Sequence, residues 1–287
     1  MKFIKDKVFF ADLMLLFTTV LWGLTFVTVK DGTKYSSFSV FIFIRFFVAS
    51  VLIFPFTIKK LKFLSSKNIF DGFILGVFVF LGFFLQTVGL KYTTPSRSAF
   101  ITGLSVIIVP FFSYFFFKKK IVFSTFIALL LSVSGLFFMF NPSFSTVINK
   151  GDIYTFLCAF VFAFVIIFVQ IFNKRNDSFL LVFIQFLTVS FFSLIFIFFN
   201  DFYISFNKNF FVGMFYTSVF ATFLALLIQN RFQKDTDEVR AGIIYTLEPV
   251  FASIFSYFIF KEHFTAGFLV GGALIFSGFL ISKIFVK

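Results

Sequence analysis

Long apolar stretches alternate with short polar segments along the whole chain. A helix needs about 20 mostly apolar residues to cross the hydrocarbon core of a bilayer. Each such stretch must be helical, because lipid offers no hydrogen-bond partner to an open strand. The ten stretches are residues 9–29, 37–58, 69–90, 96–117, 121–140, 152–172, 179–199, 210–230, 239–260 and 265–285. The pattern predicts an all-α polytopic membrane protein with ten transmembrane helices and no domain outside the membrane.

Composition supports the membrane interpretation. Hydrophobic residues make up 60% of the chain and charged residues 13%, whereas soluble domains carry about 25% charged residues. A net charge of +13 would suggest nucleic acid as a partner of a soluble protein. Here the Lys and Arg residues lie in short clusters between apolar stretches, which is the pattern that sets orientation in a bilayer. We therefore expect a lipid bilayer and no nucleic acid as partner.

The Lys and Arg residues also predict orientation. Sixteen of the 25 fall on the side that holds the N-terminus and six on the other, while Arg45, Arg97 and Arg240 lie within or at the ends of stretches. Cytoplasmic loops carry the excess of positive charge. We predict a multi-pass protein of the cell membrane with both termini in the cytoplasm.

The second half of the chain repeats the first. When residues 97–138 are aligned with 240–281, an offset of 143, twelve of 42 positions are identical, and Gln86 falls on Gln229 at the same offset. Asp12, near the start of the first stretch, corresponds to Asp152 at the start of the sixth at an offset of 140. A duplication explains this register better than chance matches between Phe-rich helices.

The predicted repeats, residues 9–140 and 152–285, each contain five stretches. Because five is odd, the second repeat must enter the bilayer from the opposite face. Inverted repeats of this kind are typical of secondary transporters, whose substrate site lies near the midplane between the halves. The pattern favours two inverted five-helix repeats that expose one site alternately to each side.

Four segments resemble a known family. They are LWGLTFVTVK at 21–30, FIRFFVAS at 43–50, TTPSRSAFITGLSVIIVP at 93–110 and RAGIIYTLEPVFASIFSYFIFKE at 240–262. In order and spacing they resemble the drug/metabolite transporter superfamily, specifically ten-helix proteins with two EamA-type repeats. The second half departs from the pattern by showing Phe162-Ala163 where the first has Trp22-Gly23. The resemblance implies a transporter of small metabolites and does not fix the substrate.

Two charged residues lie deep within predicted helices. Arg45 is eight residues from the outer end of its stretch, and an Arg at that depth costs about 3 kcal/mol or more unless it faces a partner. It is a candidate anchor for an anionic substrate group, or else it bonds backbone carbonyls. Glu248 precedes Pro249 and is a candidate for a structural ion pair with Arg45, for binding an ammonium group or coupling to protons, or for the lining of a cytoplasmic vestibule.

Other polar or amphipathic residues within the stretches can line a cavity or join helices by hydrogen bonds. The candidate substrate-binding set is Trp22, Thr25, Arg45, Gln86, Ser98, Thr102, Gln185, Gln229, Tyr245 and Glu248. Two Gly-x-x-x-Gly segments, starting at Gly72 and Gly267, permit close helix contacts within a bundle or in a homodimer.

The sequence contains no nucleotide-binding G-x-x-x-x-G-K-[ST] motif and no metal-ligand cluster. We therefore expect no cofactor, no metal and no enzymatic activity. The function that the sequence predicts is secondary active transport of small organic metabolites such as amino acids, as an exporter, with a proton or another ion as coupling partner. The alternatives are uptake of a metabolite or nucleotide-like solute, an intramembrane lipid-modifying enzyme, and a membrane scaffold.

Overall fold

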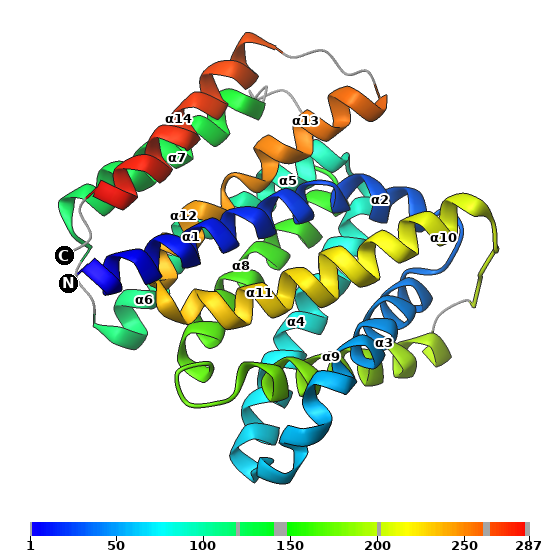
Figure 1. The fold of residues 1–287 in the computed structure, drawn as a ribbon. Coiled ribbons are helices and arrows are strands. Elements are labelled where there is room, and N and C mark those ends of the chain that lie inside the picture. The colour runs from blue at the N-terminus through cyan, green and yellow to red at the C-terminus, as the bar shows by residue number, and fades with distance from the viewer. Residues whose placement is uncertain (1, 119–120, 141–147, 200–201, 261–264, 285–287) are drawn as a thin grey trace.

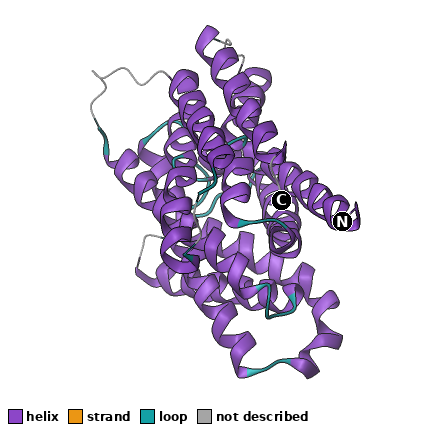
Figure 2. Ribbon diagram, turned by 90° about the vertical axis from the view of Figure 1, so that its left-hand side faces the viewer, coloured by secondary structure: helices purple, strands orange, loops and turns teal. Residues whose placement is uncertain are grey.

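The computed structural model describes residues 2–118, 121–140, 148–199, 202–260 and 265–284. Figure 2 shows them as helices joined by loops. In chain order the elements are α1 (Lys2–Gly23), α2 (Thr25–Gly32), α3 (Phe38–Thr57), η1 (Ile58–Phe63), α4 (Ser66–Tyr92), α5 (Pro95–Gly103), α6 (Ser105–Phe117), α7 (Phe123–Phe140), α8 (Lys150–Phe172), α9 (Ser178–Phe199), α10 (Lys208–Phe215), η2 (Tyr216–Leu224), α11 (Ala225–Phe232), η3 (Gln233–Asp235), α12 (Glu238–Tyr245), α13 (Glu248–Phe260) and α14 (Ala266–Ile284).

The predicted fold class is confirmed. Nine helical stretches within the described residues are long and apolar enough to cross a membrane, and a shorter apolar helix, Ala266–Ser282, accounts for a tenth. Each lies within a few residues of a stretch predicted from the sequence. Residue 285, the predicted end of the last stretch, lies outside the described residues.

Large apolar side chains cover the outside of the bundle. Phe198 and Phe115, for example, are 81% and 76% exposed, which suits contact with lipid and not with water. The interior holds apolar residues of all sizes, including fully buried Phe41, Phe46 and Phe186, together with a large set of buried Ser, Thr, Asn and Gln side chains. Lipid tails are as apolar as the helices, so close packing and hydrogen bonds hold such a bundle together.

Equivalent helices of the two repeats pack against each other in opposite directions (Figure 1). The contacts pair α7 with α14 and α3 with α9. They also pair α5 with α13 and α6 with α12. Since α5 precedes α6 whereas α12 precedes α13, the fourth and ninth spans run antiparallel. The second repeat is therefore inverted relative to the first.

Glycines allow the closest of these helix contacts. A Cβ added to Gly271 of α14 would lie 2.6 Å from the backbone nitrogen of Met139 in α7, and real Cβ contacts are not that short. Gly72 and Gly76 of α4 likewise face α9, where an added Cβ at Gly72 would lie 2.7 Å from the Cβ of Ile184. Both Gly-x-x-x-Gly segments thus take part in packing within one chain.

We expect Gly271→Ala to lower the midpoint of thermal unfolding in detergent by several degrees, because the added methyl group forces α14 away from α7, and overpacking costs about 1–3 kcal/mol. Gly272→Ala is the matched control, since its added Cβ would come no closer than 3.8 Å to Val250. Equal unfolding temperatures for the two variants would contradict the packing argument.

Candidate functional site

Three spans are interrupted near the middle of the bundle. The interruptions lie at Leu24 between α1 and α2, at Leu104 between α5 and α6, and around Leu247 between α12 and α13. At two of them the helix tightens to bonds between residues three apart: Leu104 N donates to Ile101 O at 3.2 Å and Leu247 N to Ile244 O at 3.0 Å. These donors and acceptors are each 143 residues apart, so the fourth and ninth spans break at equivalent positions.

The break before α13 has a local cause. Pro249 has no backbone N–H, so the carbonyl of Tyr245 loses the helical partner four residues later. Irregular backbone at membrane depth is tolerated only where it is buried in protein or lines a cavity. The breaks in the first, fourth and ninth spans meet this condition, since Trp22, Thr25, Gly103 and Tyr245, which flank them, line one central cavity.

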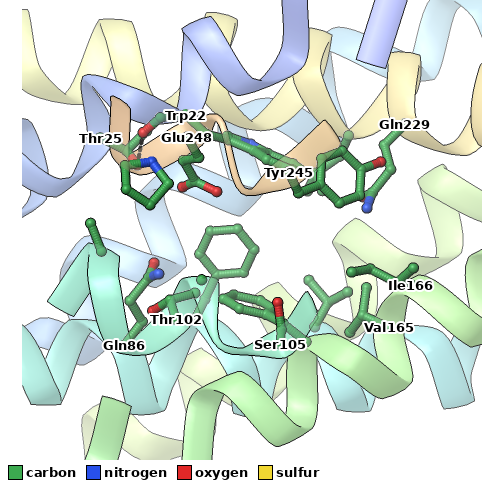
Figure 3. Close-up of a pocket in the computed structure, with 17 residues that line it drawn as sticks. Trp22, Thr25, Gln86, Thr102, Ser105, Val165, Ile166, Gln229, Tyr245 and Glu248 are labelled. Atoms are coloured by element: carbon green, nitrogen blue, oxygen red, sulfur yellow. Dashed lines mark hydrogen bonds between the residues drawn. The ribbon is translucent and has the colours of Figure 1, made fainter. Parts of the chain in front are cut away.

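The cavity encloses about 680 Å³ of empty space, including the part open to the surroundings. Figure 3 shows Trp22, Tyr245 and Glu248 on one side of the space and Gln86 and Thr102 on the other. The full lining is Trp22, Thr25, Val79, Phe83, Gln86, Ala99, Thr102, Gly103, Ser105, Phe162, Val165, Ile166, Leu226, Gln229, Tyr245, Glu248 and Pro249. Glu248 is the one charged residue among these described lining residues.

Most of the lining consists of pairs of equivalent residues from the two repeats. Six pairs are related by the offsets of 140 or 143, namely Trp22 with Phe162, Thr25 with Val165, Phe83 with Leu226, Gln86 with Gln229, Thr102 with Tyr245, and Ser105 with Glu248. The cavity therefore lies on the pseudo-twofold axis that relates the halves. Its charge is asymmetric, because Ser105 stands where the other repeat has Glu248.

The structure brings seven of the ten candidate residues together around this cavity. They are Trp22, Thr25, Gln86, Thr102, Gln229, Tyr245 and Glu248. An aromatic contact between the first and ninth spans joins two of them, with the ring centroids of Trp22 and Tyr245 5.5 Å apart. Their role in binding a substrate stays a prediction.

Arg45 lies outside the cavity lining. Its side chain is buried, with the guanidinium 4.6 Å from the ring centroid of Phe83, and its Nε donates to Thr222 Oγ1 at 2.5 Å. Among the described residues it forms no ion pair with Glu248, and its Nη2 has no hydrogen-bond partner. Arg45 thus contacts a lining residue, Phe83, and bonds to the eighth span.

Ser98 and Gln185 also lie away from the lining. Ser98 is buried with its hydroxyl 3.4 Å from that of Thr155 in α8. Gln185 is buried in α9, where its Oε1 accepts a 3.4 Å hydrogen bond from Asn230. Both join helices to one another, which was the alternative role for polar residues within spans.

The eighth span is wound as a π-helix between Tyr216 and Leu224, a rare geometry that is frequent at functional sites. The first span fixes this segment by two hydrogen bonds: Trp22 Nε1 donates to Ala221 O at 3.0 Å, and Tyr216 Oη donates to Leu21 O at 2.6 Å. Trp22 thus lines the cavity and holds the π-helical segment at the same time.

The residues that sequence reasoning missed are mostly apolar or lie at the breaks. Phe162 and Ser105 are instructive, because each is the repeat equivalent of a candidate residue, Trp22 and Glu248 respectively. The repeat offsets, applied to the candidate list, would have found them. Val79 and Ile166 carried no such signal in the sequence.

A helical polytopic membrane protein with a central, partly polar cavity between inverted repeats is the architecture of a transporter. The model of the EamA-like transporter family matches the chain twice, over residues 9–141 and 149–283. An uncharacterized transporter of Archaeoglobus fulgidus is 31% identical over 275 residues, which cover 96% of this chain and 86% of that protein. The chain belongs to the EamA-like transporter family.

A crystal structure of another protein shares the fold, with a TM-score of 0.77, 13% sequence identity, and coverage of 95% of this chain and 96% of that one. At this identity the likeness concerns the fold alone.

We expect Thr222→Val to destabilise the protein by about 1–3 kcal/mol, because it leaves the Nε of buried Arg45 without an acceptor. The same substitution in an Arg45→Met background has little effect, since the unpaired donor is gone. Thr217→Val is the matched control, because that hydroxyl bonds only carbonyls of its own helix. Thermal unfolding of the four variants in detergent checks this, and equal effects in both backgrounds would exclude a coupling between Arg45 and Thr222.

Proposed function

We propose that this protein is a secondary active transporter that exports small organic metabolites bearing an ammonium group, such as amino acids and related amines, by alternating access. The observation that carries the proposal is the single carboxylate, Glu248, in a cavity on the axis between inverted repeats. A site on that axis can be opened toward either face by equivalent movements of the two halves.

The lining supports an organic metabolite as substrate. Most of the lining residues are apolar or aromatic, among them Val79, Phe83, Phe162 and Ile166, and a few polar side chains lie between them. Small-molecule sites are typically built in this way, with the polar groups fixing the orientation of the ligand. A simple inorganic ion would gain little from apolar walls.

The chemistry of the lining supports a cationic group on that metabolite. Glu248 can pair with an ammonium, and the nearby rings of Trp22, Tyr245 and Phe83 attract cations over their faces. The side-chain amides of Gln86 and Gln229 can bond the polar remainder of the solute. Without a cationic side chain in the described lining, a purely anionic solute has no obvious partner.

The same carboxylate supports coupling to protons. An ionised carboxyl within a membrane is costly unless it is paired or protonated. Either an ammonium group or a proton neutralises Glu248, and one excludes the other. The closed transporter would therefore hold either the ammonium group or a proton as it passes from one open state to the other. The result is an exchange of the metabolite for protons.

Export is the direction that we propose, on the resemblance to drug/metabolite transporters. We expect cells that express the protein to accumulate less of a labelled amine or amino acid than cells without it. Inverting the proton gradient in vesicles should reverse the net flux. Greater accumulation in expressing cells would favour the alternative, uptake.

We expect Glu248→Gln to lower exchange of ammonium-bearing substrates at least about tenfold, which corresponds to losing about 1.4 kcal/mol or more of interaction. Counterflow in liposomes, with a panel of labelled amino acids, amines, sugars and nucleotides, measures it. Asp31→Asn is the control, since Asp31 pairs only with neighbouring Lys34 at the surface. Unchanged exchange by Glu248→Gln, or a wild-type preference for anionic solutes, would contradict the proposed site.

The repeat offers a second variant for the same test. Ser105 and Glu248 are equivalent positions on opposite sides of the pseudo-twofold axis. Glu248→Ser combined with Ser105→Glu moves the carboxylate across the cavity without changing its composition. We expect this double variant to recover part of the exchange that Glu248→Ser alone loses.

A further inference from the structure

A buried ion pair joins the two halves toward the end of the bundle where α1 begins and α14 ends, which Figure 1 marks with N and C. Arg240, in the first turn of α12, pairs with Asp12 of α1, and both side chains are almost fully buried. The hydroxyl of Thr236 also donates to Asp12, at 3.4 Å. We call Asp12, Thr236 and Arg240 the terminal-face clamp.

A second cluster joins the two halves at the opposite end. Arg97, in the first turn of α5, pairs with Asp152 of α8 at 2.6 Å. The hydroxyl of Thr93 donates to the same carboxylate at 3.0 Å. We call Thr93, Arg97 and Asp152 the opposite-face clamp. Five spans separate the starts of α1 and α8, so the two clamps lie at opposite faces of the membrane.

The two clamps are equivalent residue by residue under the repeat. Thr93 corresponds to Thr236 and Arg97 to Arg240 at the offset of 143, while Asp12 corresponds to Asp152 at 140. In each clamp one half supplies the Thr and Arg, and the other half supplies the Asp. Because the repeat is inverted, each face has the same Thr, Arg and Asp cluster, and the half that supplies the Asp at one face supplies the Thr and Arg at the other.

The backbone that carries each clamp is held in the same way. The carbonyl of Thr93 accepts from Lys30 Nζ at 2.5 Å, and that of Thr236 accepts from Gln170 Nε2 at 3.0 Å. Lys30 and Gln170 are 140 residues apart and so are also equivalent. A chance pair of surface contacts would not reproduce three kinds of equivalent bond at both faces.

We propose that the two clamps are alternating gates: each closes the cavity toward its own face, and the transporter opens on the face whose Asp–Arg pair separates. The inference rests on the alternating access proposed above. Removing water from an ion pair nearly cancels the gain from the attraction. The closed pair and the separated, hydrated pair are thus close in free energy, as a reversible gate requires.

The clamps also predict how a neutral substitution acts. In Asp12→Asn the guanidinium of Arg240 stays buried without a counter-charge, which is costly in the closed state and relieved by water in the open one. The variant should therefore favour opening at the terminal face. Asp152→Asn should favour opening at the opposite face, with a smaller shift, because Arg97 is already 31% exposed in the closed pair.

A cysteine in the cavity reports which face is open. Cys158 is the single cysteine of the chain and is buried, so Ser105→Cys in a Cys158→Ala background provides one accessible thiol. Its labelling rate by a small membrane-impermeant thiol reagent is measured from each face, in right-side-out and in inverted vesicles. We expect Asp12→Asn to raise the ratio of terminal-face to opposite-face labelling at least about threefold, and Asp152→Asn to lower it by a smaller factor.

Controls separate this inference from simple loosening of the fold. Asp31→Asn, which removes a surface ion pair within one half, should leave the ratio unchanged. The double variant with Asp12→Arg and Arg240→Asp restores the pair with reversed charges and should return the ratio toward the wild-type value. If a neutral variant does not accumulate in membranes, Thr236→Val and Thr93→Val replace it, with smaller shifts of the same signs.

Shifts in opposite directions support the gates. If the two variants shift the labelling ratio in the same direction, or not at all, the gate proposal is wrong. The proposed transport function is not contradicted by that result, provided that the background protein is labelled from both faces. Labelling of the background protein from one face alone overturns alternating access, and the gates with it.

Discussion

The bilayer leaves no backbone amide without a partner inside the chain, and the rest of this structure follows from that constraint. It makes every described span helical, and it confines irregular backbone to places where protein or a cavity surrounds it. The breaks at Leu24, Leu104 and Leu247 meet this condition by converging on one cavity. The helix interruptions thus surround the cavity that is proposed as the substrate site.

The duplication supplies the symmetry of the bundle, and residue differences between the repeats make the cavity lining asymmetric. Equivalent spans pack antiparallel, and equivalent residues face each other across the cavity. Yet Ser105 opposes Glu248, and the π-helical segment from Tyr216 to Leu224 has no counterpart in the regular helix α4. A symmetric frame can open toward both faces, whereas an asymmetric lining gives the site one preferred orientation for its solute.

Buried polar groups connect this frame in two different ways. Arg45 donates a hydrogen bond to Thr222, and its guanidinium packs on the rings of Phe83 and Phe46. The hydrogen bond links the second span to the eighth. The Asp–Arg pairs instead cross between the halves near the membrane faces, where water can reach them when the halves part. The Arg45–Thr222 bond thus lies deep in the bundle and is fixed, whereas the Asp–Arg pairs lie nearer the membrane faces and can open.

The sequence by itself determined the ten helices, the duplication and its inversion, because apolar length and the parity of five spans leave no other arrangement in lipid. It also identified most polar residues of the cavity, since polar side chains within a span must face inward. It could not tell Arg45 or Ser98 from Gln86, because hydropathy does not record which neighbouring helix a buried polar group faces. Only the tertiary structure decided that Arg45 packs on Phe83 outside the cavity lining, and that Asp12 and Asp152 meet arginines more than 50 residues away in the chain.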